Sequence, residues 1–165
     1  MAGERSRIPE LMQRDHERLD GVLRATISAD SIDVAAWQPF RSGLLRHIGI
    51  EEKILIPFVR GQRPEALPFV KQLKLDHAAL ASLLVPSPTP AVISQIQAVL
   101  AQHNPIEEGE GGLYEVCGQL AGADEADLIL RIGRAPVVPL APHYDGPRAF
   151  ASIERLLQAA GRIPK

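Results

Sequence analysis

The sequence predicts an all-α fold, a four-helix bundle followed by a C-terminal helical extension. Apolar residues recur at spacings of three and four along most of the chain, and strict alternation is scarce. Four of the five histidines fall within these apolar stripes, one on each of the first four predicted helices. No repeat or long linker divides the chain. We therefore expect one domain over residues 1–165, with the bundle at about 9–118 and the extension at about 119–165.

The first two predicted helices each carry one histidine on the apolar face. The first covers Pro9–Thr26, because proline suits a first helical turn and the apolar stripe that follows includes His16. The second covers Val34–Arg60, and His47 continues its stripe. We expect Pro57 to kink or end the last turn of this helix, since proline removes a backbone donor and clashes with the preceding turn.

The third and fourth predicted helices repeat this placement. The third covers Glu65–Leu84 with His77 on its stripe, and a proline-rich connection follows. The fourth begins near Ala91 and leads to His103. Pro105 lies just beyond that histidine, so we expect a kink there.

The last third of the sequence has weaker patterns. Residues 123–131 fit a short helix, and residues 135–147 hold four prolines and are expected to form an extended surface loop. A final amphipathic helix is expected over residues 148–162, with Phe150 and Ile153 among its inward-facing residues.

Composition excludes several classes of protein. The net charge is -2, from 18 basic and 20 acidic residues, which does not favour nucleic acid as a partner. Cys117 is the only cysteine, so neither an internal disulfide framework nor a zinc site with several thiolates is possible within the chain. No apolar run is long enough to cross a bilayer, and residues 1–7 lead into no apolar signal region. We therefore expect a cytoplasmic protein without a membrane partner.

Two of the four histidines on the stripes are followed by a glutamate four residues later, and this spacing puts both side chains on one helix face. An antiparallel bundle brings all four stripes to a common axis. Carboxylates buried there without a cation cost several kcal/mol, whereas a metal ion supplies positive charge and binds neutral imidazole. The sequence therefore predicts a metal site with six ligands: His16, His47, Glu51, His77, His103 and Glu107.

The ligand types narrow the choice of metal. Imidazole with carboxylate suits iron, manganese, zinc or copper, and six ligands exceed what one tetrahedral zinc ion needs. Two glutamates that can each bridge suggest two metal ions, for which iron is the preferred assignment and zinc or manganese the alternatives. No Glu-x-x-His pair and no HExxH motif occurs, so the ferritin-like scaffold and the HExxH zinc proteins are set aside.

The order of these motifs resembles that of the hemerythrin-like (HHE cation-binding) family. One histidine, an HxxxE pair, one histidine and a second HxxxE pair follow one another over residues 16–107, and nothing after about residue 118 is covered. The HxxxE pair alone is a weak signal, whereas the four segments in this order are fairly specific. The segments that carry the resemblance are Asp15–Leu19, Arg46–Pro57, Asp76–Leu80 and His103–Glu108.

The resemblance implies an up-down-up-down bundle with a non-haem dinuclear iron site. The four histidines would be terminal ligands, and Glu51 and Glu107 would bridge the two irons. Oxygen carriers of this family have a fifth histidine one turn before the third-helix histidine, where this chain has Leu73. That difference leaves about two coordination positions open. We therefore expect water or another ligand to fill these positions, or the site to be more reactive, rather than reversible oxygen carriage.

Several side chains near the motifs have alternative interpretations. Because Pro105 interrupts the second HxxxE pair, Glu108 or Glu110 could replace Glu107 as the ligand. His143 could supply a missing ligand, but a surface position in the proline-rich loop is the expected one.

Four further residues are expected to have no part in ligation. Asp15 and Asp76 each precede a ligand histidine and are expected to be solvated at the surface. Tyr114 is expected to pack in the core, and Cys117 to be a buried bystander.

Three functions remain open at this level. The leading hypothesis is a protein that binds or senses oxygen, nitric oxide or a related oxidant. The second is a redox enzyme with the same site, which would reduce nitric oxide or peroxide or repair iron centres. Family members of the repair type carry a cysteine-rich N-terminal segment that is absent from these 165 residues. The third is a mononuclear or structural metal site, with residues 119–165 contacting an unknown protein partner.

Overall fold

The computed structural model describes residues 5–29 and 31–165, and this part of the chain is helical. It contains no strand, only an isolated antiparallel bridge between Ile27 and Ile32. None of the described helices is both long and apolar enough to cross a membrane. Residues 1–4, which belong to the segment that argues against a signal peptide, lie outside the described residues.

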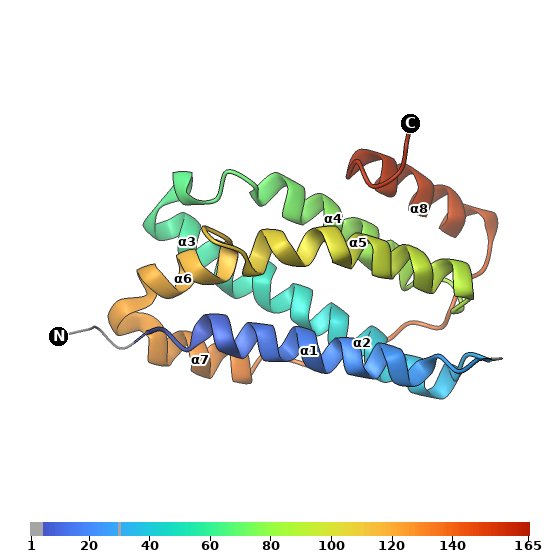
Figure 1. The fold of residues 1–165 in the computed structure, drawn as a ribbon, viewed down its shortest axis with the longest axis horizontal. Coiled ribbons are helices and arrows are strands. Elements are labelled where there is room, and N and C mark those ends of the chain that lie inside the picture. Colours follow the sequence, from blue (N-terminus) through green and yellow to red (C-terminus); the bar gives the residue numbers. More distant parts are fainter. Residues whose placement is uncertain (1–4, 30) are drawn as a thin grey trace.

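Four long helices lie roughly along the long axis of the molecule (Figure 1). Helix α1 packs against α2, and α4 packs against α5. Two of these helices begin with a side-chain cap, as expected for exposed backbone N–H groups: Asp33 accepts from Ala36 N at 3.0 Å, and Thr89 accepts from Val92 N at 3.2 Å. The helices are α1 (Ile8–Thr26), α2 (Val34–Ile50), α4 (Val70–Leu83) and α5 (Pro90–Glu108).

A π-helical turn lies just before Pro57, and the helix continues past this proline, so the predicted stop is absent. The turn spans Glu51–Leu55, and the Ile56 N–H donates to the carbonyl of Glu51, five residues earlier. Helix α3 (Ile56–Gln62) then continues past the proline. We attribute the wider turn to Pro57, because its ring and missing N–H are incompatible with a regular α-helix through this point.

Two other regions differ from the predicted boundaries. The third predicted helix begins later than expected: a 3₁₀ turn covers Pro64–Ala66, and α4 starts only at Val70. The sequence patterns missed α6 (Leu113–Ala121), which follows the glycine-rich turn after α5. Helix α7 (Glu125–Gly133) corresponds to the short helix expected near residues 123–131.

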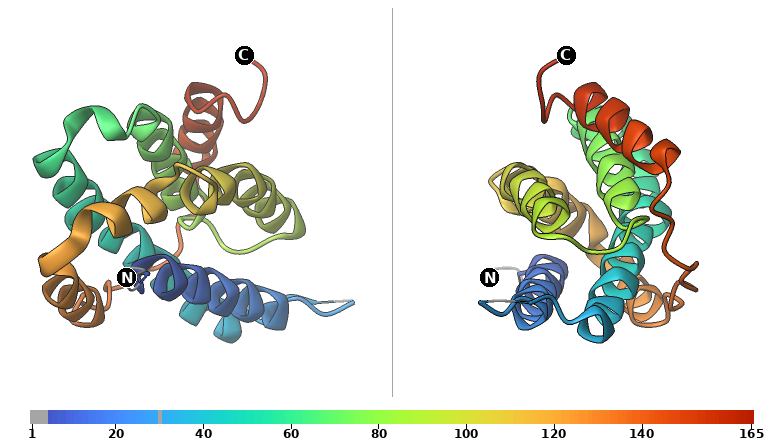
Figure 2. Two further views of the ribbon diagram at one scale, coloured as in Figure 1. Left: turned by 60° about the vertical axis from the view of Figure 1, so that its left-hand side comes forward. Right: turned by 90° about the vertical axis from the view of Figure 1, so that its right-hand side faces the viewer.

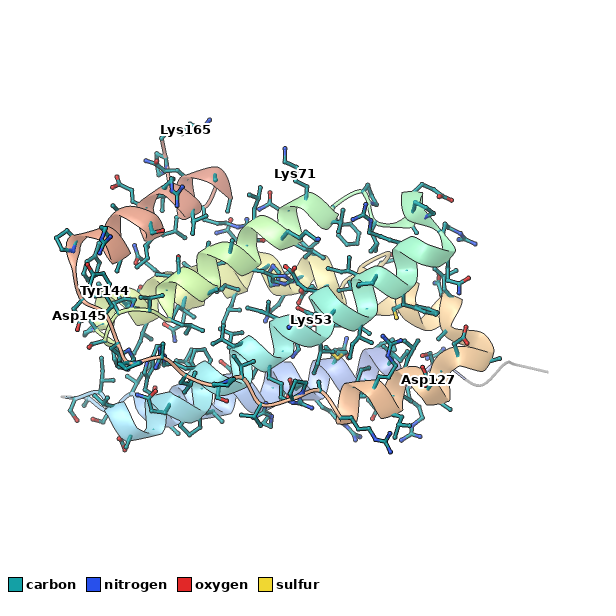
Figure 3. All side chains as sticks on the ribbon, turned by 180° about the vertical axis from the view of Figure 1, so that it is seen from behind. Lys53, Lys71, Asp127, Tyr144, Asp145 and Lys165 are labelled. Carbon is teal, nitrogen blue, oxygen red and sulfur yellow. The ribbon has the colours of Figure 1, made fainter. Side chains whose placement is uncertain are left out.

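Residues 134–146 form an extended segment over α2, which leads to α8 (Pro147–Ala159) (Figure 3). Two arginines of α2 hold this segment: Arg46 Nε donates to the carbonyl of Ala135 at 2.9 Å, and Arg41 Nη2 donates to that of Ala141 at 3.2 Å. Helix α8 packs against the outside of α4 (Figure 2). The inward orientation predicted for Phe150 is wrong, since this side chain is 47% exposed.

The interior consists of two hydrophobic clusters, and the histidines lie between them. On α1, Met12 belongs to one cluster and Leu19 to the other, with His16 between them. On α4, Leu73 and Leu80 flank His77 in the same way. Helices α2 and α5 repeat the arrangement around His47 and His103. The fold therefore encloses a polar layer between two apolar ones.

Candidate metal centre

The six ligands predicted from the sequence come together in this polar layer. They form two groups in which the nitrogen and oxygen atoms lie within 4.8 Å of one another, and both groups contain Glu51 and Glu107. One group adds the histidines of α1 and α2, and the other adds those of α4 and α5. Five of the six residues are at most 3% exposed, and the His16 side chain is 10% exposed. The groups are His16, His47, Glu51 and Glu107, and Glu51, His77, His103 and Glu107.

Each glutamate directs its two oxygens toward different histidine pairs. Glu51 places Oε1 3.1 Å from His47 Nε2 and Oε2 3.1 Å from His77 Nε2. Glu107 places Oε2 3.3 Å from His16 Nε2 and Oε1 2.7 Å from His103 Nε2. A carboxylate that faces two nitrogen pairs in this way has the arrangement of a bridge between two cations.

The donor set fits two metal ions. Ligand atoms at 2.0–2.2 Å from one ion are at most about 4.4 Å apart, and the atoms of each group all lie within 4.8 Å of one another. Glu51 Oε2 is buried and has no hydrogen-bond partner. A metal ion would satisfy this oxygen, because buried carboxylates are otherwise costly.

A second carboxylate lies behind every one of the four histidines. His47 Nδ1 donates to Asp15 at 2.7 Å, and His103 Nδ1 donates to Asp76 at 3.1 Å. The prediction that these aspartates are solvated surface residues is therefore wrong, and Asp76 is fully buried. His77 Nδ1 donates to Glu52 at 2.9 Å, and His16 Nδ1 is paired with Glu108.

These pairs determine which histidine nitrogen faces the centre. With each Nδ1 donating to a carboxylate, the four Nε2 atoms point at Glu51 and Glu107. Carboxylate partners behind ligand histidines fix the ring orientation and make the ligand nitrogen more basic. The arrangement is thus oriented for ligation through Nε2.

The charges of the site shift its pKa values strongly. Burial alone lowers the pKa of His47, but the carboxylates of Glu51 and Asp15 outweigh burial and raise it to about 10. The pKa of His77 is raised to about 10 and that of His103 to about 9, in both cases because carboxylates outweigh burial. Burial raises the pKa of Glu107, but hydrogen bonds from His103, His16 and His77 hold it well below its usual range. The site thus favours ionised carboxylates.

Tyr114 is a member of the site that the sequence patterns missed. Its hydroxyl donates to Glu51 Oε1 at 2.5 Å and lies 3.1 Å from Glu107 Oε2. The same oxygen lies 3.0 Å from His16 Nε2 and 3.1 Å from His47 Nε2. Burial and the two glutamate charges raise the pKa of Tyr114 well above its usual range. Tyr114 is fully buried in one of the two apolar clusters, as the core-packing prediction expects, and its hydroxyl oxygen is in addition within reach of His16 and His47.

A tight turn between α5 and α6 brings Tyr114 to this place. A Cβ on Gly112 would lie 2.6 Å from the carbonyl oxygen of Glu107 and 2.7 Å from that of Ile106, so the turn requires glycine. The signal for α6 is the spacing of its buried residues, which include Leu113, Cys117 and Ala121 at intervals of four. Because this pattern is short and directly follows a glycine-rich stretch, it does not by itself predict a helix.

The alternative ligands considered from the sequence lie outside the two groups. Glu107 belongs to both groups, Glu108 contacts only the outer nitrogen of His16, and Glu110 is exposed. His143 lies outside both groups, with Nε2 3.1 Å from Gln38 Nε2. Leu73, at the position of the fifth histidine, is fully buried among apolar residues.

A cleft of about 700 Å³ connects the site to the surface between α1 and α5. Its inner end is formed by His16, His47 and His103 together with Glu51. The outer end includes exposed residues of α1 and α5, such as Asp20 and Gln97. The volume of this cleft is much larger than that of a diatomic gas molecule.

Cys117 is buried in one of the two apolar clusters, in agreement with the prediction of a buried bystander. The thiol is fully buried, and burial raises its pKa to about 12. We expect it to react with a disulfide reagent at least about 100-fold more slowly in the folded than in the unfolded protein, since the thiolate is the reactive form. Absorbance of the released thiol measures this directly, because the chain has no other cysteine. Equal rates in both states would contradict the prediction.

Comparison of the chain with models of known protein families, with curated proteins and with solved structures gave no match. The class that the fold and the site define is accordingly an all-helical protein with a buried histidine–glutamate cluster that could hold a metal ion.

Proposed function

We propose that this chain is a hemerythrin-like protein whose centre holds two non-haem iron ions. In this proposal α1, α2 with α3, α4 and α5 form an up-down-up-down bundle, and residues 119–165 are an extension outside it. Glu51 and Glu107 bridge the irons, His16 and His47 bind one of them, and His77 and His103 bind the other. The observation that supports this most directly is the split orientation of each glutamate toward two histidine pairs.

Tyr114 is the proposed additional ligand of the iron held by His16 and His47. Its oxygen already lies within 3.1 Å of both of those Nε2 atoms. As a ligand the phenol would lose its proton, since a cation outweighs the two carboxylates that hold it neutral. The two irons would then differ in their ligands, because Leu73 offers none to the other.

The proposed activity is the binding or sensing of oxygen, nitric oxide or a related oxidant by the reduced centre. When bound, the irons supply reversible electron transfer to such a molecule, and the two apolar clusters enclose the ligand layer on its two sides. A redox enzyme that reduces peroxide or nitric oxide is the second candidate. The observation that favours it is the open cleft, which gives a reactant access to the site.

Iron reconstitution tests the centre and the tyrosine together. We expect about two irons per chain and a visible phenolate-to-iron charge-transfer band in the oxidised protein. Tyr114→Phe should lose this visible band but keep the iron. The matched control is Tyr144→Phe, which changes the chain's only other tyrosine, a residue that is 43% exposed.

The possible outcomes separate the candidates. A single zinc ion per chain with no charge-transfer band would contradict the dinuclear iron proposal, and a band that persists in Tyr114→Phe would exclude Tyr114 as its source. Titration of the reduced protein with oxygen or nitric oxide divides a binder from an enzyme. Stoichiometric uptake without turnover supports binding or sensing, whereas repeated consumption of the oxidant supports the enzyme.

A further inference from the structure

The turn that ends α8 carries a side chain toward α4. Helix α8 ends in a Schellman motif, in which the N–H of Arg162 donates to the carbonyl of Leu157 at 2.8 Å. The N–H of Gly161 donates to the carbonyl of Gln158 at 3.0 Å, and Gly161 has the left-handed φ of 69° that the motif requires. The side chain of Arg162, which is only 12% exposed, then lies against the fully buried Asp76 of α4.

Arg162 binds both oxygens of Asp76. Arg162 Nε donates to Oδ1 at 2.8 Å, and Arg162 Nη2 donates to Oδ2 at 2.7 Å. The same Oδ2 accepts from His103 Nδ1 at 3.1 Å. The guanidinium and the imidazole of a proposed ligand therefore share one carboxylate oxygen, and the guanidinium makes the shorter contact.

The aspartate behind His47 divides its oxygens differently. Asp15 Oδ1 accepts from Arg18 Nε at 2.8 Å, and Asp15 Oδ2 accepts from His47 Nδ1 at 2.7 Å. Here the arginine and the histidine use separate oxygens, and the histidine contact is shorter than that of His103. The Arg18 side chain is also 50% exposed, so water screens its charge more than that of Arg162.

A carboxylate oxygen that is shared with a cation gives less negative charge to the histidine. A carboxylate behind a ligand histidine makes the ligand nitrogen more basic, and a guanidinium on the same oxygen withdraws part of that charge. The guanidinium also repels a metal ion directly. We propose that Arg162, as a positioning residue that acts through Asp76, lowers the metal affinity of the half of the centre that contains His103. The effect on a metal ion rests on the proposed function, whereas the shared oxygen does not.

Titration of the metal-free full chain with Co²⁺ tests the sign of this effect. We expect Arg162→Ala to bind one of two Co²⁺ ions about tenfold more tightly, the low end of the effects of groups behind ligand histidines. Arg162→Lys keeps the positive charge and should return the affinity toward that of the unsubstituted protein. If Arg162 only held α8 in place, its loss would loosen His103 and weaken binding instead. Weaker or unchanged Co²⁺ binding in Arg162→Ala would therefore overturn the proposal.

Proton NMR of the metal-free protein tests the shared oxygen itself. Without the guanidinium, the hydrogen bond from His103 Nδ1 to Asp76 should shorten, so the resonance of this N–H proton should move downfield in Arg162→Ala. Disappearance of the resonance in His103→Ala assigns it. An unchanged position or an upfield shift in Arg162→Ala would contradict the sharing.

Arg155→Ala is the matched control for both measurements. It removes an exposed arginine of α8 whose side chain contacts Ser152 of the same helix. The Co²⁺ affinities and the His103 resonance should both stay unchanged in this variant.

The two measurements together separate this proposal from the proposed function. A downfield shift in a chain that binds neither Co²⁺ nor iron would support the shared oxygen and refute the metal centre. Two metal ions per chain, with the same affinity and the same resonance in Arg162→Ala, would support the centre and refute the role of Arg162.

Discussion

Glu107→Gln is expected to remove both metal ions, lowering the content from about two per chain to near zero. Glu107 places one oxygen near His16 and the other near His77 and His103, so its loss damages both groups at once. Loss of a carboxylate behind a ligand histidine typically weakens metal binding 10- to 100-fold, so loss of a bridge should weaken it at least about 100-fold. Metal analysis after dialysis measures the effect.

Two variants make this result specific. Glu110→Gln changes an exposed carboxylate three residues further on and should keep both ions. His103→Ala affects one group only, so its content should fall to about one ion per chain. If Glu107→Gln retained as much metal as Glu110→Gln, the bridging role would be excluded.

Asp76→Ala is expected to lower the free energy of unfolding of the metal-free protein by about 3–5 kcal/mol, the range for breaking a buried ion pair. Asp76 is fully buried and accepts from Arg162 Nε at 2.8 Å, Arg162 Nη2 at 2.7 Å and His103 Nδ1 at 3.1 Å. Removal of this carboxylate leaves Arg162 and His103, its two basic partners, without an acceptor. Urea unfolding followed by circular dichroism gives the change.

The control for this variant is Asp127→Ala on α7. The Asp127 side chain is 67% exposed and lies 3.9 Å from Arg131, so its loss should cost less than about 1 kcal/mol. Arg162→Ala should also destabilise the protein, and its effect should not add to that of Asp76→Ala, because both break the same pair. A loss for Asp76→Ala no larger than that for Asp127→Ala would refute the buried pair.

The helical fold and the meeting of the six predicted ligands could be predicted from the sequence. Apolar spacing shows which face of a helix turns inward, and His16, His47, His77 and His103 interrupt that face in a way that a purely apolar core does not explain. The spacing of four between His47 and Glu51, repeated after His103, then puts the carboxylates on the same face. The iron content and the activity stay predictions.

The outer carboxylates and Tyr114 could not be predicted in the same way. Asp15 contacts a histidine 32 residues away and Asp76 one 27 residues away, so no local spacing reveals either pair. Tyr114 depends on the turn at Gly112, and a glycine-rich stretch alone does not say which way the chain reverses. Phe150 is exposed because α8 packs through Ala149, Ile153 and Leu157, a stripe that leaves the neighbouring position outside.

The π-helical turn at Glu51–Leu55 lets one continuous helical run serve two faces of the interior. Each residue of an α-helix advances the side-chain direction by about 100°, so a turn with one extra residue shifts the rotational phase of everything after it by that amount. His47, before the turn, and Glu51, its first residue, point into the histidine–glutamate cluster; after the turn, Ile56 and Val59 join the apolar cluster that includes residues of α6. The π-helical turn thus joins the helix that carries His47 to α3, which packs against α6, the helix that carries Tyr114.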